Sequence, residues 1–304
     1  MNPLAAPEAS KCEATAAGSP QPVAPMNAAA RASRTRKIRC VRPRCMPAIV
    51  PPPAKNVLTL YTAAMPPPPA QAMLLAAGRG ERMRPLTDAM PKPLLPVCGK
   101  PLMQWPMEAL ARGGFTRLVV NTAWLGTQIS SHFGPQPTLG GQGALSISYS
   151  EEGRDFGGAL ETAGGIARAL PLLDEVFWVL AGDVFVPDFA FRREAFERFA
   201  AGGRLAHLWL VPNPPHNPRG DFGISPAGLA LSRADESFTY STIGLYQRAF
   251  FDALPPGNPQ GLKAPLAPLL RAAMDNGQVS AELYTGAWTD VGTPERLAQL
   301  NATH

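Results

Sequence analysis

The segment Met73–Pro101 holds residues whose types and spacing favour binding of a phosphate chain. Gly78 and Gly80 follow a short apolar run, and a glycine backbone can approach a ligand closely and turn consecutive N–H groups toward it. Positive charge follows from three arginines and one lysine, namely Arg79, Arg82, Arg84 and Lys92. Prolines on both sides of Lys92 restrict the backbone of its loop. These features indicate a site for a polyanion.

Two common phosphate-binding motifs do not fit this segment. The dinucleotide motif needs a third glycine where the chain has Met83, and the P-loop needs Gly-Lys followed by Ser or Thr, which is absent here. The segment therefore indicates neither NAD binding nor P-loop ATPase chemistry.

Two aspartates are candidates for holding a metal ion beside phosphate. Asp183 follows an apolar run and Gly182, and Asp290 lies in the segment Trp288–Gly292. In open parallel sheets, ligands bind beyond the carboxyl ends of the strands, where Asp183 and Asn121 should meet. Mg²⁺ is typically held by one or two carboxylates together with phosphate oxygens and water. For Asp290 a second interpretation stays open, that of an acidic residue stabilising the N-terminus of the last helix.

The elements that position these residues alternate between strand and helix patterns from residue 71 onward. We expect strands at 72–75, 117–121, 145–149, 176–181, 205–211, 238–246 and 279–284. We expect helices at 103–112, 126–133, 162–170, 192–201, 264–276 and from Pro294, with Thr293 as N-cap and a loop at 150–161. This alternation predicts an α/β fold with a mainly parallel sheet covered by helices on both faces.

Residues 1–70 differ from the rest in composition. They hold nine Lys and Arg against two Glu, whereas the remainder holds 19 basic and 21 acidic residues, so the net charge of +5 comes from this tail. We predict a disordered Ala/Pro/Arg-rich extension, followed by one domain at 71–304. An over-early start, a basic appendage for membrane or nucleic acid, and a transit peptide remain open for the tail.

Other classes of function lack support in the sequence. The domain is not basic, so nucleic acid is not an expected partner, and no apolar run is long enough to span a membrane. The four cysteines imply no disulfide framework and agree with a cytoplasmic location. His132, His207 and His216 are isolated in the sequence, and we expect them to be solvated or packed rather than catalytic.

The segment from Leu75 to Pro101, LAAGRGERMRPLT followed by PKPLLPVCGKP, resembles the signature of the sugar-phosphate nucleotidyltransferases. This resemblance implies a Rossmann-like domain with a small antiparallel β excursion. It also implies attack by a sugar-1-phosphate oxygen on the α-phosphate of a nucleoside triphosphate, with release of pyrophosphate. Arg82 would hold the leaving phosphates, and Lys92 would neutralise the attacking and α-phosphates. Mg²⁺ would bind Asp183 and Asp290, because the family pairs a Gly-Asp aspartate with a late aspartate in W-x-D-x-G-T.

The resemblance also implies which residues surround the nucleotide. These are Ala76, Ala77, Gly78, Gly80, Glu81, Asn121, Glu161, Thr162 and Gly164. The last three lie in LETAGGI, which occupies the place of the family's loop for base and sugar. The same segment also fits a plain helix start with Thr162 as N-cap and the glycines as loop.

Within that family, the motifs GERMRPLT, NTAWLG, LETAGGI, RGDF and WTDVGT resemble the N-acetylmuramate-1-phosphate uridylyltransferases of bacterial cell-wall recycling. UTP and a sugar-1-phosphate are then the expected partners, with a monomer or homodimer as the assembly. The Glu-Lys-Pro element that other members use against sugar hydroxyls is missing, so Asp221 is our candidate for contacting the sugar, although it fits a turn cap equally well. A mannose-1-phosphate guanylyltransferase, another hexose-1-phosphate enzyme and a non-catalytic nucleotide-sugar sensor are the alternatives.

Overall fold

The computed structural model describes residues 70–139 and 144–303. The predicted tail lies outside these residues except for Ala70, where the first strand begins. Its three interpretations therefore stay predictions. Within the described ranges, no helix is long and apolar enough to cross a membrane.

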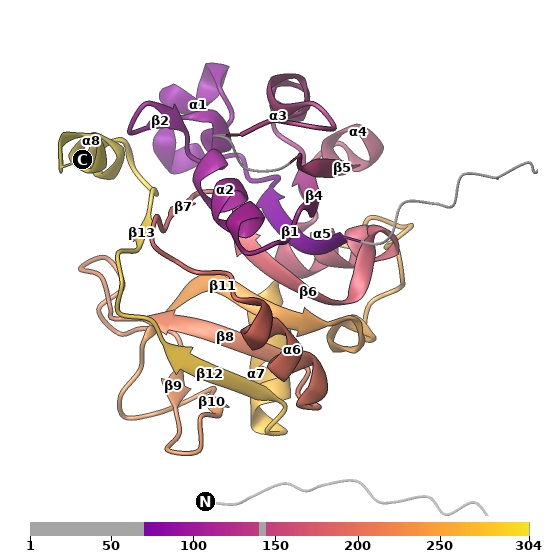
Figure 1. The fold of residues 1–304 in the computed structure, drawn as a ribbon, viewed down its shortest axis with the longest axis vertical. Helices are drawn as coiled ribbons and strands as arrows, with labels where there is room; N and C mark the ends of the chain where they lie inside the picture. Colours follow the sequence, from indigo (N-terminus) through magenta and orange to yellow (C-terminus); the bar gives the residue numbers. More distant parts are fainter. Residues whose placement is uncertain (1–69, 140–143, 304) are drawn as a thin grey trace, which may run out of the picture. The chain divides into compact units, whose positions relative to one another are not determined.

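A seven-stranded sheet in the order β12-β8-β11-β6-β1-β4-β5 forms the centre of the fold (Figure 1). Its strands are β1 (Ala70–Ala76), β4 (Arg117–Thr122), β5 (Ser146–Glu151), β6 (Leu173–Ala181), β8 (Ala206–Val211), β11 (Thr239–Gln247) and β12 (Val279–Leu283). β11 runs antiparallel to β6 and β8, and the other pairs are parallel. The predicted mainly parallel sheet with an antiparallel excursion is confirmed.

Three short antiparallel strand pairs lie outside this sheet among the described residues. They join β2 (Pro96–Val97) to β3 (Lys100–Pro101), β7 (Val184–Phe185) to β13 (Thr289–Asp290), and β9 (Gly223–Ile224) to β10 (Ala230–Leu231). The second of these pairs brings the chain near its C-terminal end back beside the end of β6.

Helices cover both faces of the sheet. The helices are α1 (Leu86–Ala89), α2 (Gln104–Arg112), α3 (Gly126–Phe133), α4 (Glu152–Phe156), α5 (Glu161–Ala169), α6 (Arg193–Ala201), α7 (Leu266–Asp275) and α8 (Pro294–Thr303). Buried residues of α2, α3 and α6 belong to one core cluster, and those of α5 and α7 belong to another. Along β6, Trp178 and Leu180 enter the first cluster whereas Phe177 and Val179 enter the second. A strand covered on both faces needs such an unbroken apolar run.

A third, smaller core cluster fastens α8 to the phosphate-binding segment. Leu297 and Leu300 of α8 pack in it with Met83, Leu95 and Val97. At the edge of this cluster Asn301 accepts a hydrogen bond from the Cys98 N–H at 2.8 Å and donates one to the Pro96 carbonyl at 3.1 Å. The last helix therefore braces a loop that lies about 200 residues earlier in the chain.

The segment 150–161 differs from the prediction. It contains helix α4 instead of being loop throughout, and α5 begins at Glu161 with Leu160 as its N-cap residue, so Thr162 is not the N-cap. Gly165 lies inside α5. A side chain is not tolerated at this position, because a Cβ would lie 2.5 Å from the Glu152 carboxylate. The glycines of LETAGGI thus allow close packing of a helix. From the sequence alone, glycines in such a helix cannot be distinguished from glycines in a loop. The remaining predicted helices and strands are present, with ends shifted by at most three residues.

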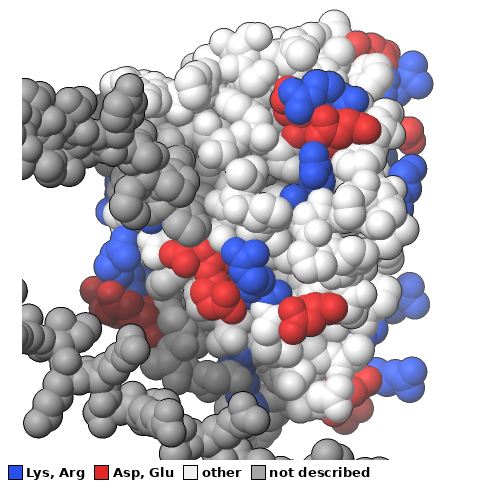
Figure 2. All heavy atoms as spheres, turned by 90° about the vertical axis from the view of Figure 1, so that its right-hand side faces the viewer, with Lys and Arg blue, Asp and Glu red and all other residues white. Residues whose placement is uncertain are grey.

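On the face shown in Figure 2, basic and acidic side chains are interspersed between larger areas of uncharged residues. This mixed distribution agrees with the near balance of charges in residues 71–304.

The end of α2 at Gly113 packs closely against the segment before α6, and a substitution of Gly113 tests this packing. A Cβ at this position would lie 2.0 Å from the Phe191 carbonyl oxygen, so that the backbone would have to move. We expect Gly113→Ala to lower the free energy of unfolding by about 1–3 kcal/mol, measured by urea denaturation. Gly158→Ala is the matched control, since a Cβ there has no heavy atom within 4 Å. Equal stability of the two variants would contradict this packing.

Candidate active site

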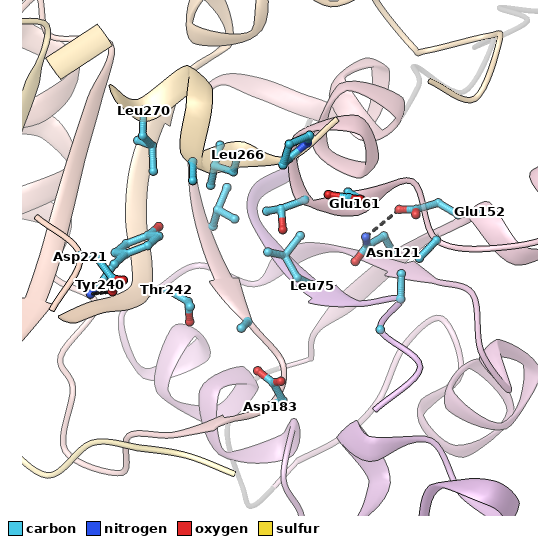
Figure 3. A pocket seen from close by; sticks show the side chains of 18 of the residues that line it. Leu75, Asn121, Glu152, Glu161, Asp183, Asp221, Tyr240, Thr242, Leu266 and Leu270 are labelled. Atoms are coloured by element: carbon cyan, nitrogen blue, oxygen red, sulfur yellow. Dashed lines mark hydrogen bonds between the residues drawn. The ribbon is translucent and has the colours of Figure 1, made fainter. Parts of the chain in front are cut away.

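A cavity of about 690 Å³ opens beyond the carboxyl ends of β1, β4 and β6. Figure 3 shows Asn121 and Glu152 at one end, Asp221 and Tyr240 at the other, and Asp183 between them at the rim. The predicted site residues that line this cavity are Ala77, Gly78, Asn121, Glu161, Thr162, Asp183 and Asp221. The structure therefore brings together predicted site residues from five separate segments at the edge of the sheet where ligands bind in such folds.

A second cavity of about 410 Å³ lies beside the first, over the phosphate-binding segment. Leu75, Gly78 and Asp183 line both cavities, so the two meet at Asp183. The other predicted site residues that line it are Ala76, Gly80, Glu81, Arg82 and Lys92. The cationic part of the site is thus separate from the larger, more apolar part.

The phosphate-binding loop is folded tightly around Gly80. Its φ of +67° is a conformation that side chains rarely adopt, and a Cβ would lie only 3.3 Å from Cβ of Lys92. Arg79 packs its guanidinium 3.6 Å from the centre of the Trp124 ring and pairs with Asp88 at 3.0 Å. These contacts anchor the loop to the NTAWLG segment that follows β4.

The three arginines of this loop have different surroundings. Arg79 and Arg84 both pair with Asp88, Arg84 at 2.8 Å. Arg82 is exposed and has no ion pair or hydrogen bond within the described part of the chain. Among the three, Arg82 is the one whose charge is left for a ligand.

Lys92 is the buried cation of the site. Its Nζ donates to the Asp183 carboxylate at 2.5 Å, and its side chain is 10% exposed against 37% for Asp183. The 3-10 turn at Lys92–Leu94, which follows Pro91, fixes the direction of the side chain. Because the aspartate is the more exposed partner, its carboxylate is accessible from both cavities while the lysine stays behind it.

Asp290 has a different environment from Asp183, although their backbones are adjacent. Asp290 pairs with Val184 across the β7–β13 ladder, and the Val291 N–H donates to the Asp183 carbonyl at 3.1 Å. The Asp290 carboxylate, however, contacts Arg296 Nη1 at 2.5 Å and His216 Nε2 at 2.9 Å. It lines a separate cavity of about 370 Å³. His216, which is isolated in the sequence, is thus packed against Asp290, because the fold brings the 214–216 loop against β13.

The described residues contain no group of three or more His, Cys, Asp or Glu side chains arranged to hold a metal ion. Arg296 lies in the first turn of α8, so the contact between it and Asp290 is compatible with the interpretation of Asp290 as a charge near a helix start. The role of Asp290 as a metal ligand stays a prediction.

Glu152 is a residue of the site that the sequence analysis missed. It is fully buried, and one oxygen accepts from Asn121 Nδ2 at 2.6 Å while the other accepts from the Leu160 N–H at 2.7 Å (Figure 3). Asn121 Oδ1 in turn accepts the Ala76 N–H at 2.9 Å. This network ties the ends of β1 and β4 to the start of α5. Burial raises the pKa of Glu152 above its ordinary value, and the two hydrogen bonds oppose the shift.

Thr242 is a second residue that the sequence gave no reason to select. It lines the larger cavity with a φ of +66°, which is unusual for a β-branched residue, and it sits where the pairing of β11 with β8 shifts register. Its buried hydroxyl has no hydrogen-bond partner among the described residues. Strained backbone and an unpaired polar group at a cavity wall are typical of ligand sites.

Asp221 and Gly164 have local partners in the structure. Asp221 Oδ2 accepts from the Tyr240 N–H at 2.9 Å and from Asn217 Nδ2 at 3.2 Å, so this oxygen has the role of a turn cap while the residue also faces the cavity. Gly164 is absent from the lining of the two cavities, and its N–H donates to the Ala264 carbonyl. The contact of each with substrate stays a prediction.

The raised pKa of Glu152 predicts that its contribution to the free energy of unfolding depends on pH. Because the folded chain holds this proton more tightly than the unfolded chain, the contribution of Glu152 to the free energy of unfolding falls as pH rises above about 4.3, the ordinary value for Glu. We expect the free energy of unfolding of Glu152→Gln, relative to wild type, to increase from about pH 4 to about pH 8. Urea denaturation across this range measures it, with exposed Glu197→Gln as control. A relative stability that stays constant with pH would contradict the burial argument.

Three comparisons place the chain among known proteins. A family model described as Nucleotidyl transferase matches residues 71–232. N-acetylmuramate alpha-1-phosphate uridylyltransferase of Neisseria meningitidis is 46% identical over 238 residues, which cover 76% of this chain and 97% of the relative. The protein of the same description from Caulobacter vibrioides is 40% identical over 39% of this chain and 44% of its own length. Mannose-1-phosphate guanylyltransferase of Mycobacterium tuberculosis is 28% identical over 76% of this chain and 63% of its own length.

Solved structures share the fold at lower identity. A Bacillus anthracis protein described as a glucose-1-phosphate thymidylyltransferase, in complex with sucrose, aligns with a TM-score of 0.63 and 20% identity over 77% of this chain and 94% of its own. HddC of Yersinia pseudotuberculosis aligns with a TM-score of 0.57 and 16% identity over 77% of this chain and 99% of its own. The family model covers more than half of this chain, and the Neisseria relative is covered over nearly its whole length. The chain belongs to the nucleotidyl transferase family.

Proposed function

We propose that this chain transfers UMP from UTP to N-acetylmuramate-1-phosphate, giving UDP-N-acetylmuramate and pyrophosphate, in the cytoplasm where UTP is available. The observation that carries the proposal is the meeting of a cationic cavity and a larger apolar cavity at Asp183. Two substrates of different character fit such a pair, a triphosphate and a sugar. The identity to the Neisseria uridylyltransferase over 97% of that protein supports the choice of base and sugar.

The reaction joins two polyanions, so positioning and charge neutralisation are the tasks of the protein. An oxygen of the sugar phosphate attacks the α-phosphorus of UTP, the bond between α-phosphorus and the bridging oxygen breaks, and pyrophosphate leaves with that oxygen. Arg82 is exposed at the smaller cavity and has no ion pair with any described residue, so it is suited to hold the leaving phosphates. Lys92 is held at the junction of the cavities, where the attacking and α-phosphates would meet.

The carboxylates suit Mg²⁺ to different degrees. Asp183 fits, because its partly exposed carboxylate faces both cavities and one or two carboxylates with phosphate oxygens satisfy this ion. Asp290 fits only after its carboxylate leaves Arg296 and His216, since these contacts occupy it in the structure. When bound, Mg²⁺ would neutralise charge on the phosphate oxygens. We assign the ion to Asp183 and, after this rearrangement, to Asp290.

Pyrophosphate release tests the proposed reaction. UTP, GTP, dTTP and CTP are each combined with N-acetylmuramate-1-phosphate, N-acetylglucosamine-1-phosphate, glucose-1-phosphate and mannose-1-phosphate, in the presence of Mg²⁺. We expect the highest kcat/KM with UTP and N-acetylmuramate-1-phosphate, and a loss of at least about hundredfold in Asp183→Asn. GTP with mannose-1-phosphate would replace the substrates. Nucleotide-sugar binding without turnover in any combination would indicate a sensor.

The assignment of Asp290 has its own test. Asp290→Asn should raise the Mg²⁺ concentration needed for half-maximal activity by about tenfold, because one anionic ligand is lost. The exposed Asp188→Asn controls for the loss of any nearby carboxylate. An unchanged Mg²⁺ dependence in Asp290→Asn would leave Asp290 as a partner of Arg296 and His216 and not of the metal ion.

A further inference from the structure

The end of the larger cavity that contains Asp221 is the place where we expect the sugar and any charged group on it to bind. This inference rests on the proposed function, in which the sugar is N-acetylmuramate. N-acetylmuramate differs from N-acetylglucosamine by a lactyl ether on O3, which adds a methyl group and a carboxylate. A site selective for N-acetylmuramate must therefore accept one more negative charge close to the sugar ring.

The charged residues in the otherwise largely apolar lining of this cavity are mostly acidic. Four carboxylic residues face it, namely Glu152, Glu161, Asp183 and Asp221. Among the described residues that line it, Arg271 is the only Lys or Arg. An anionic sugar substituent would be repelled at every other charged position of this wall, since like charges at short range are unfavourable. Arg271 is thus the one lining residue whose charge favours the lactyl group.

Arg271 is an exposed residue that contacts two neighbouring segments at that end of the cavity. It follows Leu270 of α7, whose side chain Figure 3 shows on the same side of the cavity as Asp221 and Tyr240. Its Nη1 donates to the Ser232 carbonyl at 2.5 Å, and Nη2 donates to the Asp221 carbonyl at 3.4 Å. Its guanidinium carbon lies 5.0 Å from the centre of the Phe222 ring.

These contacts orient the guanidinium without neutralising it. Both acceptors are uncharged backbone carbonyls, and within the described chain no ion pair involves Arg271. A guanidinium has five N–H donors in a fixed plane, so donors remain for a ligand. Contacts with carbonyls and an aromatic ring restrict the side chain before binding, so it loses less conformational entropy when it binds a carboxylate.

We propose that Arg271 binds the lactyl carboxylate of the sugar and determines selectivity for N-acetylmuramate-1-phosphate over N-acetylglucosamine-1-phosphate. Leu266 and Leu270, both buried residues of α7 in the same cavity wall, supply apolar surface for the lactyl methyl group. Asp221, one residue before Phe222, remains available for sugar hydroxyls through the carboxylate oxygen that Tyr240 and Asn217 leave unused.

A purely structural role is the competing explanation, because Arg271 also ties α7 to the segments of Ser232 and Asp221. Loss of such a tie would impair both sugars alike. Loss of a contact to the lactyl carboxylate would impair only the sugar that carries it. The ratio of kcat/KM for the two sugar phosphates therefore separates the two roles.

The experiment measures kcat/KM of the full chain with UTP for both sugar phosphates, in wild type, Arg271→Met, Arg271→Lys and Lys263→Met. We expect Arg271→Met to lower kcat/KM for N-acetylmuramate-1-phosphate by about ten- to hundredfold, chiefly through KM, the range for a hydrogen bond to a charged group. The value for N-acetylglucosamine-1-phosphate should fall much less. Arg271→Lys should restore part of the selectivity. Lys263→Met, which removes an exposed cation outside the cavity lining, should leave the ratio unchanged.

An equal loss for both sugars in Arg271→Met, or an unchanged ratio, would overturn the inference while the wild-type enzyme still prefers N-acetylmuramate-1-phosphate. A wild-type chain that uses UTP without that preference would instead overturn the proposed function, and the role of Arg271 with it. Calorimetric binding of UDP-N-acetylmuramate and UDP-N-acetylglucosamine to the same variants decides the matter if Arg271→Met is inactive. A selective loss of UDP-N-acetylmuramate affinity supports the proposal, and a parallel loss overturns it.

Discussion

The buried amide of Asn121 is the interaction on which the candidate site depends. Its oxygen accepts the N–H at the end of β1, and its nitrogen donates to Glu152, which in turn holds the N–H at the start of α5. Three chain segments that diverge from the sheet are thereby fixed relative to one another at the floor of the larger cavity. Since the carboxylate and amide oxygens of this network all have partners, removing one member leaves others unsatisfied.

The ion-pair partners of the cations in the site determine which of these cations remain available to a ligand. In the phosphate-binding segment, Arg79 and Arg84 are used to shape the loop through Asp88, and Lys100 is held by Glu108 over the Trp105 ring. Lys92 faces Asp183, and Arg82 faces open space at the smaller cavity. Among the described cations that line this cavity, Arg82 has no ion pair, Lys92 is held by Asp183, and Arg79 is held by Asp88. This arrangement favours binding at a defined position over diffuse attraction.

Much of this could be predicted from the sequence. The apolar run of β6 ending at Gly182 and Asp183 indicated a buried parallel strand with a carboxylate at its carboxyl end, and glycine spacing indicated a tight loop at Gly80. Glu152 could not be predicted, because a buried carboxylate depends on partners 8 and 31 residues away. The register shift at Thr242 has no local signal, since neighbours in β8 create it. The contact of His216 with Asp290 likewise arises only when distant segments meet, whereas Arg296 lies only six residues after Asp290.

The third core cluster has a consequence for the order in which the enzyme is made. The phosphate-binding segment leaves the ribosome early, but Met83, Leu95 and Val97 bury their side chains against Val291, Leu297 and Leu300, which are synthesised last among the described elements. Until then this loop has an uncovered apolar side, and the strand that carries Asp290 has not joined β7. Nascent chains therefore hold an incomplete phosphate site throughout translation. A chain that stops shortly before α8 would lack Leu297 and Leu300 and would leave this apolar side of the loop without its cover.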